Sequence, residues 1–163
     1  MIISLTGTPG TGKTTVSEQL GEFEVIDLTR FVKDHGLGEQ EEEFEVDIEA
    51  MVEKLKEEID EEDVVIEGHL SHHFPADYCV VLRCDPEELE DRLSERKYSD
   101  QKVEENVQSE MLDVILSEAV QEQEDVIEIN TTGREADDVA EEVERRVEKG
   151  ETGYGEIDWT GKI

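Results

Sequence analysis

The composition of this 163-residue chain is dominated by acidic side chains: 47 Asp and Glu residues stand against 15 Lys and Arg, which gives a net charge of −32. The length suits one domain, since a chain of this size can bury ~70% of its unfolded surface. A hydrophobic content of 35% combined with this charge would by itself favour disorder. Regular apolar segments separate the acidic stretches, however, and indicate a folded protein with an acidic surface. Such a surface lacks a basic stripe, so we expect no direct contact with nucleic acid.

The chain opens on an apolar segment, residues 1–6, that leads directly into the glycine-rich sequence Gly7-Thr-Pro-Gly-Thr-Gly-Lys-Thr14. All fixed positions of a Walker A motif are present, followed by residues compatible with a helix. In this motif the backbone N–H groups surround a phosphate, and the helix adds its positive N-terminal end. We expect Lys13 to contact the β- and γ-phosphates and the Thr14 hydroxyl to bind Mg²⁺. A strand-to-helix turn that binds nothing is the weaker interpretation, so the sequence predicts a nucleoside triphosphate site.

Apolar runs and helical stretches alternate along the rest of the chain. Residues 64–66 and 79–82 are continuous apolar runs, as expected for strands that are buried on both faces. The pattern predicts an α/β fold in which helices cover both faces of a five-stranded parallel sheet. Strands are expected at 2–6, 24–27, 64–67, 79–83 and 126–130, and helices at 14–20, 28–34, 47–59, 86–95, 103–121 and 134–149.

The cysteine and histidine residues show no spacing typical of a metal site. Cys79 and Cys84 lie five residues apart on one extended segment, so their Cα atoms should be ~16 Å apart, too far for a disulfide. We expect reduced thiols in a cytoplasmic protein without a signal peptide. No apolar run approaches the ~18 residues of a membrane span. His72 and His73 are expected to pack or to cap a helix.

The acidic surface resembles that of proteins from salt-loving archaea. At molar salt the Debye length is only ~3 Å, so repulsion between surface carboxylates is largely screened. In dilute buffer the same repulsion would destabilise the fold. The low lysine content and the 5% aromatic content agree with this resemblance.

Three further motifs carry a family resemblance. They are Glu67-Gly-His69 after the third expected strand, the stretch from Arg92 to Asn106, and Asp158-Trp159 near the end of the chain. Together with the Walker A motif, they resemble the archaeal adenylate kinase family that is related to the eukaryotic coilin-interacting nuclear ATPase. The resemblance spans roughly residues 1–160. It implies a P-loop fold of the nucleoside monophosphate kinase type.

The resemblance also implies how the chain is divided and which residues form the site. A kinase domain would span 1–150, with a monophosphate-binding segment at about 29–52 and a short lid at about 95–106. The glycines of the tail separately indicate that 151–163 forms a mobile extension. Lys13, Glu67 and His69 would be catalytic, and Arg30 would bind the phosphate of AMP. Glu67 would hold Mg²⁺ together with Thr14, if necessary through water. The implied ATP-binding positions are Gly10, Gly12, Lys13, Thr14, Thr15, Arg92, Arg96 and Arg134.

Several of these residues have alternative interpretations. Arg92 and Arg96 could form ordinary helix salt bridges with neighbouring glutamates, and Arg30 could pair with a nearby acid. His69 could carry a proton, position a water molecule, or serve only the structure. Tyr98 and Trp159 are more often packing residues than partners of a nucleotide base.

The function implied by the resemblance is Mg²⁺-dependent transfer of phosphate from ATP to AMP, giving two ADP, together with ATP hydrolysis. The related proteins also act in maturation of the small ribosomal subunit, through a platform ribosomal protein with a basic tail. The alternative is therefore an assembly ATPase, gated by nucleotide, whose kinase activity is incidental. A kinase of shikimate or dephospho-coenzyme A fits the lid and the Glu67-Gly-His69 motif less well.

The chain also departs from ordinary adenylate kinases. Those enzymes commonly carry an Asp-Gly-Phe-Pro-Arg stretch where this chain has Glu67-Gly-His-Leu-Ser71, and no arginine occurs between Arg96 and Arg134. Each missing charge-assisted contact corresponds to ~1.5–3 kcal/mol of hydrogen bonding. This difference favours slower monophosphate turnover and leaves room for the ATPase alternative.

Overall fold

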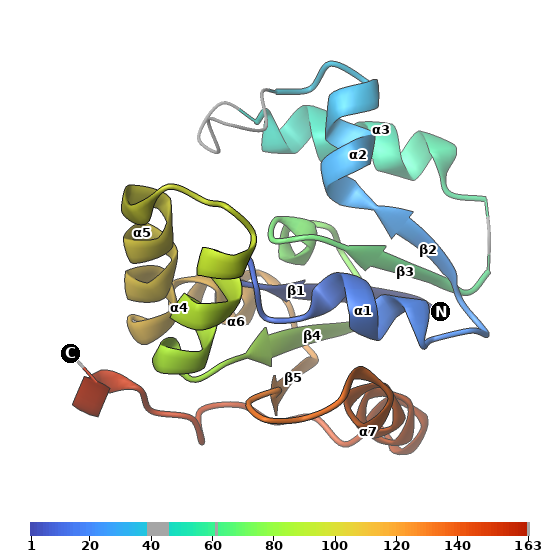
Figure 1. The fold of residues 1–163 in the computed structure, drawn as a ribbon. Coiled ribbons are helices and arrows are strands. Elements are labelled where there is room, and N and C mark those ends of the chain that lie inside the picture. The colour runs from blue at the N-terminus through green and yellow to red at the C-terminus, as the bar shows by residue number, and fades with distance from the viewer. Residues whose placement is uncertain (39–45, 61, 163) are drawn as a thin grey trace.

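The computed structural model describes residues 1–38, 46–60 and 62–162 (Figure 1). Its centre is a parallel five-stranded sheet with the strand order β2-β3-β1-β4-β5. The strands are β1 (Ile2–Gly7), β2 (Glu24–Asp27), β3 (Val64–Glu67), β4 (Tyr78–Arg83) and β5 (Val126–Asn130). The predicted fold class is therefore confirmed, and each predicted strand lies within one residue of an observed one.

Helices cover both faces of the sheet. On one face, α1 (Lys13–Glu18) and α7 (Ala136–Lys149) pack on side chains of β1, β4 and β5. On the other face, α6 (Val114–Glu122) packs on β4 and β5, while α2 (Leu28–Asp34) and α3 (Ile48–Glu58) pack beside β3. The continuous apolar runs of β3 and β4 are buried between these layers, as the sequence predicts.

The connections place the glycine-rich loop at the carboxyl end of the central strand. β1 lies between β3 and β4, so the loop after Gly7 opens at the edge of the sheet where β3 ends in Glu67. In open α/β sheets, ligands bind in the crevice at this edge. Helix α4 (Pro86–Glu95) borders the same edge, and its start is fixed by the Asp85 cap and by Pro86 in the first turn.

The prediction of one continuous helix at 103–121 is wrong. The structure has two helices there, α5 (Asp100–Met111) and α6, separated by Asp113 in the left-handed conformation with a φ of 56°. The guanidinium of Arg83 donates to the carbonyl of Glu110 at 3.1 Å and to the Asp113 carboxylate at 2.5 Å. The break between α5 and α6 therefore lies at a tertiary contact with the buried Arg83, and the local apolar pattern does not reveal it.

The C-terminal tail is attached to the domain rather than free of it. Gly153 lies beside β5, where it donates to Val126 at 2.8 Å and accepts from Glu128 at 3.0 Å. Trp159 then reaches α5, and the short helix η3 (Thr160–Lys162) follows. Backbone pairing and one indole therefore connect a segment without apolar periodicity to the domain, and its mobility stays a prediction.

The predicted monophosphate-binding segment and lid each correspond to a pair of helices and their connection. Helices α2 and α3 flank the first, although its acidic loop 39–45 lies outside the described residues. Residues 95–106 form the turn from α4 into the first half of α5. Among the described helices, none has the length and apolar character needed to cross a membrane.

Candidate nucleotide-binding and catalytic site

The glycine-rich loop has the backbone shape of a phosphate cradle. Gly10 and Gly12 have φ values of 94° and 104°, which side-chain-bearing residues rarely adopt. A Cβ at Gly10 would lie 2.8 Å from Leu89 and 2.9 Å from Leu93 of α4. The absence of a side chain therefore lets α4 pack directly against the loop.

Lys13 is folded back over the loop that precedes it. Its ammonium donates to the carbonyl oxygens of Gly7 at 2.9 Å and Thr8 at 3.1 Å, and the side chain is buried. Burial lowers the pKa of Lys13 to about 8, although the nearby Glu67 carboxylate raises it in part. A phosphate bound in the loop would supply a second negative partner for this ammonium.

The predicted catalytic residues meet around one small pocket of about 140 Å³. The P-loop, the end of β3 and the turn after α4 all contribute to it. The lining residues are Pro9, Gly10, Gly12, Lys13, Thr14, Thr29, Glu67, Gly68, His69, Arg96 and Tyr98. Most of these residues belong to the predicted site, but Tyr98 was expected to be a packing residue and Thr29 was not predicted.

Two oxygen donors suited to Mg²⁺ face each other in this pocket. The Thr14 hydroxyl lies 3.4 Å from the Glu67 carboxylate. Burial raises the pKa of Glu67, and the ammonium of Lys13 opposes this effect. Asp27 lies beside Glu67 at the end of the neighbouring strand. Hydroxyl and carboxylate oxygens are the ligands that Mg²⁺ prefers, so the residues present fit this ion.

His69 has a buried ring nitrogen without a partner. Its Nε2 atom makes no hydrogen bond with any described residue, although it is shielded from solvent. Burial lowers the pKa of His69 to about 4, and the positive charge of Lys13 acts in the same direction. The imidazole is therefore neutral at physiological pH and can accept a proton or orient a water molecule in the pocket.

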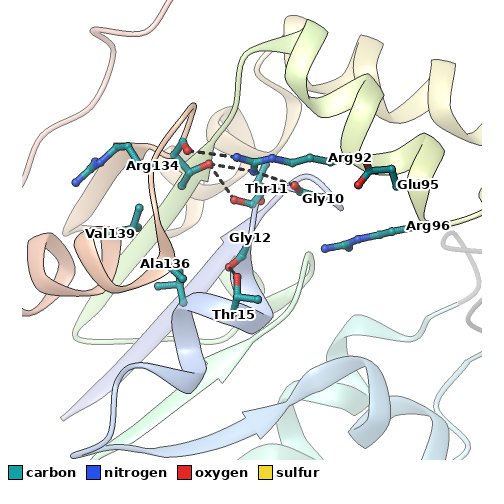
Figure 2. Close-up of a pocket in the computed structure, with 12 residues that line it drawn as sticks. Gly10, Thr11, Gly12, Thr15, Arg92, Glu95, Arg96, Arg134, Ala136 and Val139 are labelled. Carbon is teal, nitrogen blue, oxygen red and sulfur yellow. Dashed lines mark hydrogen bonds between the residues drawn. The ribbon is translucent and has the colours of Figure 1, made fainter.

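A second, larger hollow of about 420 Å³ also borders the loop (Figure 2), and it shares Gly10, Gly12 and Arg96 with the smaller pocket. Its polar walls come from the P-loop, from α4 and from the segment after β5, and α7 adds the apolar side chains Ala136 and Val139. The predicted ATP-binding residues Gly10, Gly12, Thr15, Arg92, Arg96 and Arg134 all line it. No sequence motif marks the apolar wall, because Ala136 and Val139 belong to the apolar face of α7 that packs in the core.

The three arginines of this hollow differ in their contacts. Arg92 donates to Gly10 at 3.2 Å and forms a 2.7 Å ion pair with Glu88, so the helix salt bridge considered as an alternative is present. Arg134 pairs with Glu142 at 2.8 Å. The guanidinium of Arg96 forms no ion pair with a described residue and extends toward the P-loop in Figure 2. It is the arginine best placed to meet a phosphate.

Arg30 stands apart from both hollows. Its backbone N–H donates to the Asp27 cap at the start of α2, and its side chain is exposed. The structure therefore does not bring Arg30 together with the other site residues.

Behind the P-loop lies a buried ionic network that the sequence pattern did not reveal. Arg83, which is 1% exposed, bonds Glu110 at 2.9 Å and Glu128 at 2.7 Å. The second oxygen of Glu110 accepts from the hydroxyl of Thr8, next to the first glycine of the loop, at 3.0 Å. The network thus links β4, α5 and the phosphate loop.

These features define a class of protein: a P-loop kinase of the nucleoside monophosphate kinase type. Structural likeness agrees with this class. Shikimate kinase from Acinetobacter baumannii aligns with a TM-score of 0.66 at 18% identity, over 92% of this chain and 94% of that one. Deoxyadenosine kinase from M. mycoides aligns with a TM-score of 0.62 at 12% identity, over 91% of this chain and all of that one. At such identities the likeness shows the fold alone.

Sequence comparison identifies the family. The model of the family described as "AAA domain" matches residues 3–113. A protein of Thermococcus gammatolerans named "Putative adenylate kinase" is 44% identical over 98% of this chain and 93% of its own length. A protein of the same name from Archaeoglobus fulgidus is 43% identical over 100% of this chain and 94% of its own length. The chain belongs to this archaeal adenylate kinase family.

Proposed function

We propose that the chain is a Mg²⁺-dependent adenylate kinase that also hydrolyses ATP. The observation that carries this proposal is the convergence of Lys13, Thr14, Glu67, His69 and Arg96 on one pocket beside the P-loop. Phosphoryl transfer depends mainly on positioning and on neutralising charge, and these side chains supply both. The names of the relatives support AMP as the acceptor.

In the transfer, an oxygen of the AMP phosphate forms a bond to the γ-phosphorus while the bond to the β,γ-bridging oxygen breaks, which leaves two ADP. The backbone of the P-loop and the ammonium of Lys13 hold the phosphates of ATP. Arg96 is free to neutralise charge that develops on the transferred group. Its position at the end of α4, in the turn toward α5, places it on the wall of the pocket that Lys13 also lines.

Mg²⁺ would be held by Thr14 and Glu67, and it would supply charge neutralisation to the phosphates. The apolar side chains Ala136 and Val139 offer a surface for the adenine ring in the larger hollow. For hydrolysis, a water molecule replaces AMP. The neutral His69 can then orient this water and accept its proton.

The second candidate function is an assembly ATPase, gated by nucleotide, in maturation of the small ribosomal subunit. The lack of arginines between Arg96 and Arg134 favours it, as does the position of Arg30 outside the pockets. An acidic surface with a net charge of −32 suits a basic protein partner such as a platform ribosomal protein. This role would place the protein in the cytoplasm, in line with its buried cysteine thiols.

The experiment that tests the kinase proposal measures ADP and inorganic phosphate in parallel, at high KCl, with and without each nucleoside monophosphate. A kinase forms two ADP for each ATP consumed when AMP is present, and releases no phosphate by this route. Hydrolysis forms one ADP and one phosphate regardless of AMP. Phosphate release that no monophosphate alters would favour the assembly ATPase, and absence of all ATP turnover would contradict both functions.

The partner is tested separately, by pull-down of the recombinant platform ribosomal protein in ATP and in ADP. Charge steering is largely lost in molar KCl, where the Debye length is ~3 Å or less, so a specific complex must persist there. We expect a complex whose affinity differs between the two nucleotides. A complex that forms only in dilute buffer would reflect nonspecific charge attraction and would contradict the assembly role.

A further inference from the structure

A cluster of two histidines and two glutamates lies outside the nucleotide site, where the short helix η2 (Ser71–His73) packs against α6. His72 is completely buried and His73 largely so. Glu118 and Glu122 are one helical turn apart on α6 and are about half exposed. The cluster is thus anchored in the core on the histidine side and open to solvent on the carboxylate side.

The distances within the cluster are short. The Nε2 atom of His72 lies 3.0 Å from Glu118 Oε1, and His73 Nε2 lies 3.7 Å from the same oxygen. His73 Nδ1 is 2.6 Å from a Glu122 oxygen. Ligand atoms of His72, His73 and Glu122 all lie within 4.8 Å of one another, a grouping that no other set of described residues matches.

The contact between His73 and Glu122 is close but is not a hydrogen bond. Nδ1 of His73 is buried and has no hydrogen-bond partner among the described residues, in spite of the carboxylate beside it. By contrast, the contact between His72 Nε2 and Glu118 at 3.0 Å is a hydrogen bond. In the described part of the chain, these carboxylates form ion pairs with the two histidines alone. A cation between the rings and the carboxylates would give His73 Nδ1 the partner that it lacks.

We propose that His72, His73 and Glu122 bind a divalent transition-metal ion, with Zn²⁺ the best match, and that Glu118 completes the site. Neutral imidazole and carboxylate are ligands of zinc, whereas Mg²⁺ and Ca²⁺ select oxygen-only sets. Tetrahedral zinc with bonds of about 2.0–2.2 Å places its ligand atoms about 3.3–3.6 Å apart. The present distances, 2.6 Å between His73 and Glu122 and up to 4.8 Å across the group, lie on either side of that range.

Supporting contacts hold the histidines in place. The Thr6 hydroxyl lies 2.8 Å from Nδ1 of His72, which leaves Nε2 directed toward the carboxylates. The amide of Gln123 donates to the carbonyls of His72 and Phe74, both at 2.7 Å. Metal-binding histidines are usually oriented in this way by hydrogen bonds to their other ring nitrogen and to their loop.

A bound ion would act on the neighbouring nucleotide site through the chain itself. His69 precedes η2 by two residues, and Thr6 belongs to the strand that enters the P-loop. An ion bound by both η2 and α6 would fix the position of η2, and of His69 just before it, relative to α6 and the strands on which α6 packs. The role assigned to the ion is structural, and metal binding does not depend on the kinase proposal.

The test is a titration of the full chain with Co²⁺, followed by competition with Zn²⁺, in the absence of nucleotide and Mg²⁺. Tetrahedral Co²⁺ absorbs visibly, and a protein-free sample in the same salt serves as the blank. We expect one equivalent of Co²⁺ to bind and Zn²⁺ to displace it. Loss of one ligand in Glu122→Gln or His73→Ala should weaken binding by about 100-fold or more, and loss of the supporting hydroxyl in Thr6→Val by about 10-fold.

The matched control is His35→Ala, which removes a histidine that lies 2.8 Å from Glu58 and is not part of the proposed site. This variant should bind Co²⁺ like the unaltered chain. Because Glu122 is half exposed, Glu122→Gln should fold normally, which circular dichroism checks. Absence of the tetrahedral spectrum would overturn the proposal. An affinity that Glu122→Gln leaves unchanged would also overturn it, and would assign the ion to the acidic surface.

Discussion

His69 illustrates how a single side chain can be placed for chemistry. Its ring is neutral, its Nε2 atom is buried without a partner, and it lines the same pocket as Lys13 and Glu67. We expect His69→Ala to lower ATP hydrolysis by about 10²-fold or more, in the range of general acid–base contributions, and to leave ATP affinity nearly unchanged. Steady-state phosphate release and equilibrium ATP binding measure the two effects. Altered thermal stability with an unaltered rate would instead assign His69 to the structure.

Lys13 gives a prediction on pH. Burial lowers its pKa from 10.5 to about 8 in the free protein, and only the protonated ammonium neutralises phosphate. ATP affinity should therefore be constant below pH 8 and fall above it, by up to tenfold for each pH unit. The guanidinium of Arg96 lowers the pKa of Lys13, so Arg96→Ala should raise this pKa. In that variant the decline in ATP affinity should begin at a higher pH. Affinity that stays constant up to pH 10 would contradict the assignment.

At the residue scale, the sequence could predict those site residues that a local motif contains. Lys13 and Thr14 follow from the loop, and Glu67 and His69 follow from the end of a buried strand. Arg83 could not be found in this way, because its partners Glu110 and Glu128 lie 27 and 45 residues away. The partnership of His73 with Glu122 is likewise a product of tertiary packing.

At the element scale, the C-terminal tail and α5 meet at Glu110. The indole N–H of Trp159 donates to Glu110 at 3.3 Å, and the same carboxylate accepts from Arg83 and from the backbone of Cys84. Trp159→Phe removes the N–H but keeps a ring, and should lower the free energy of unfolding by about 1 kcal/mol. Glu110→Gln should lower it by about 1.5–3 kcal/mol, because Arg83 loses one charge-assisted hydrogen bond but keeps Glu128 and Asp113 as partners.

Chemical denaturation at constant high KCl measures these differences. Tyr154→Phe is a matched control, since Tyr154 lies on the same tail but is exposed. It should leave stability unchanged. Equal stability of Trp159→Phe and the unaltered chain would show that the tail contributes nothing to this network.

The elements themselves show where sequence reasoning succeeds. Strands β3 and β4 are buried on both faces, so their apolar runs specify them directly. The boundary between α5 and α6 was missed because Asp113 is held by Arg83 rather than by a local stop signal. The pairing of the tail with β5 could not be predicted, because it uses backbone groups, which leave no pattern in the side chains.

At the scale of the whole molecule, the net charge of −32 predicts a strong response to salt. Screening strengthens as the Debye length falls from ~10 Å at 0.1 M to ~3 Å at 1 M, so repulsion between carboxylates decreases. We expect the thermal midpoint to rise steadily over this range of KCl. A sucrose series at constant low salt controls for general solute effects. A midpoint that KCl leaves unchanged would contradict the comparison with proteins of salt-loving archaea.

The central claim is that the P-loop of this chain transfers phosphate from ATP to AMP. The most direct measurement follows ADP formation from ATP and AMP at high KCl, in the unaltered chain and in Lys13→Ala. The unaltered chain should form two ADP for each ATP consumed. Lys13→Ala should lose this activity while keeping its fold by circular dichroism, because the charge that neutralises the β- and γ-phosphates is gone. Turnover in Lys13→Ala equal to that of the unaltered chain would show that the catalytic site lies elsewhere.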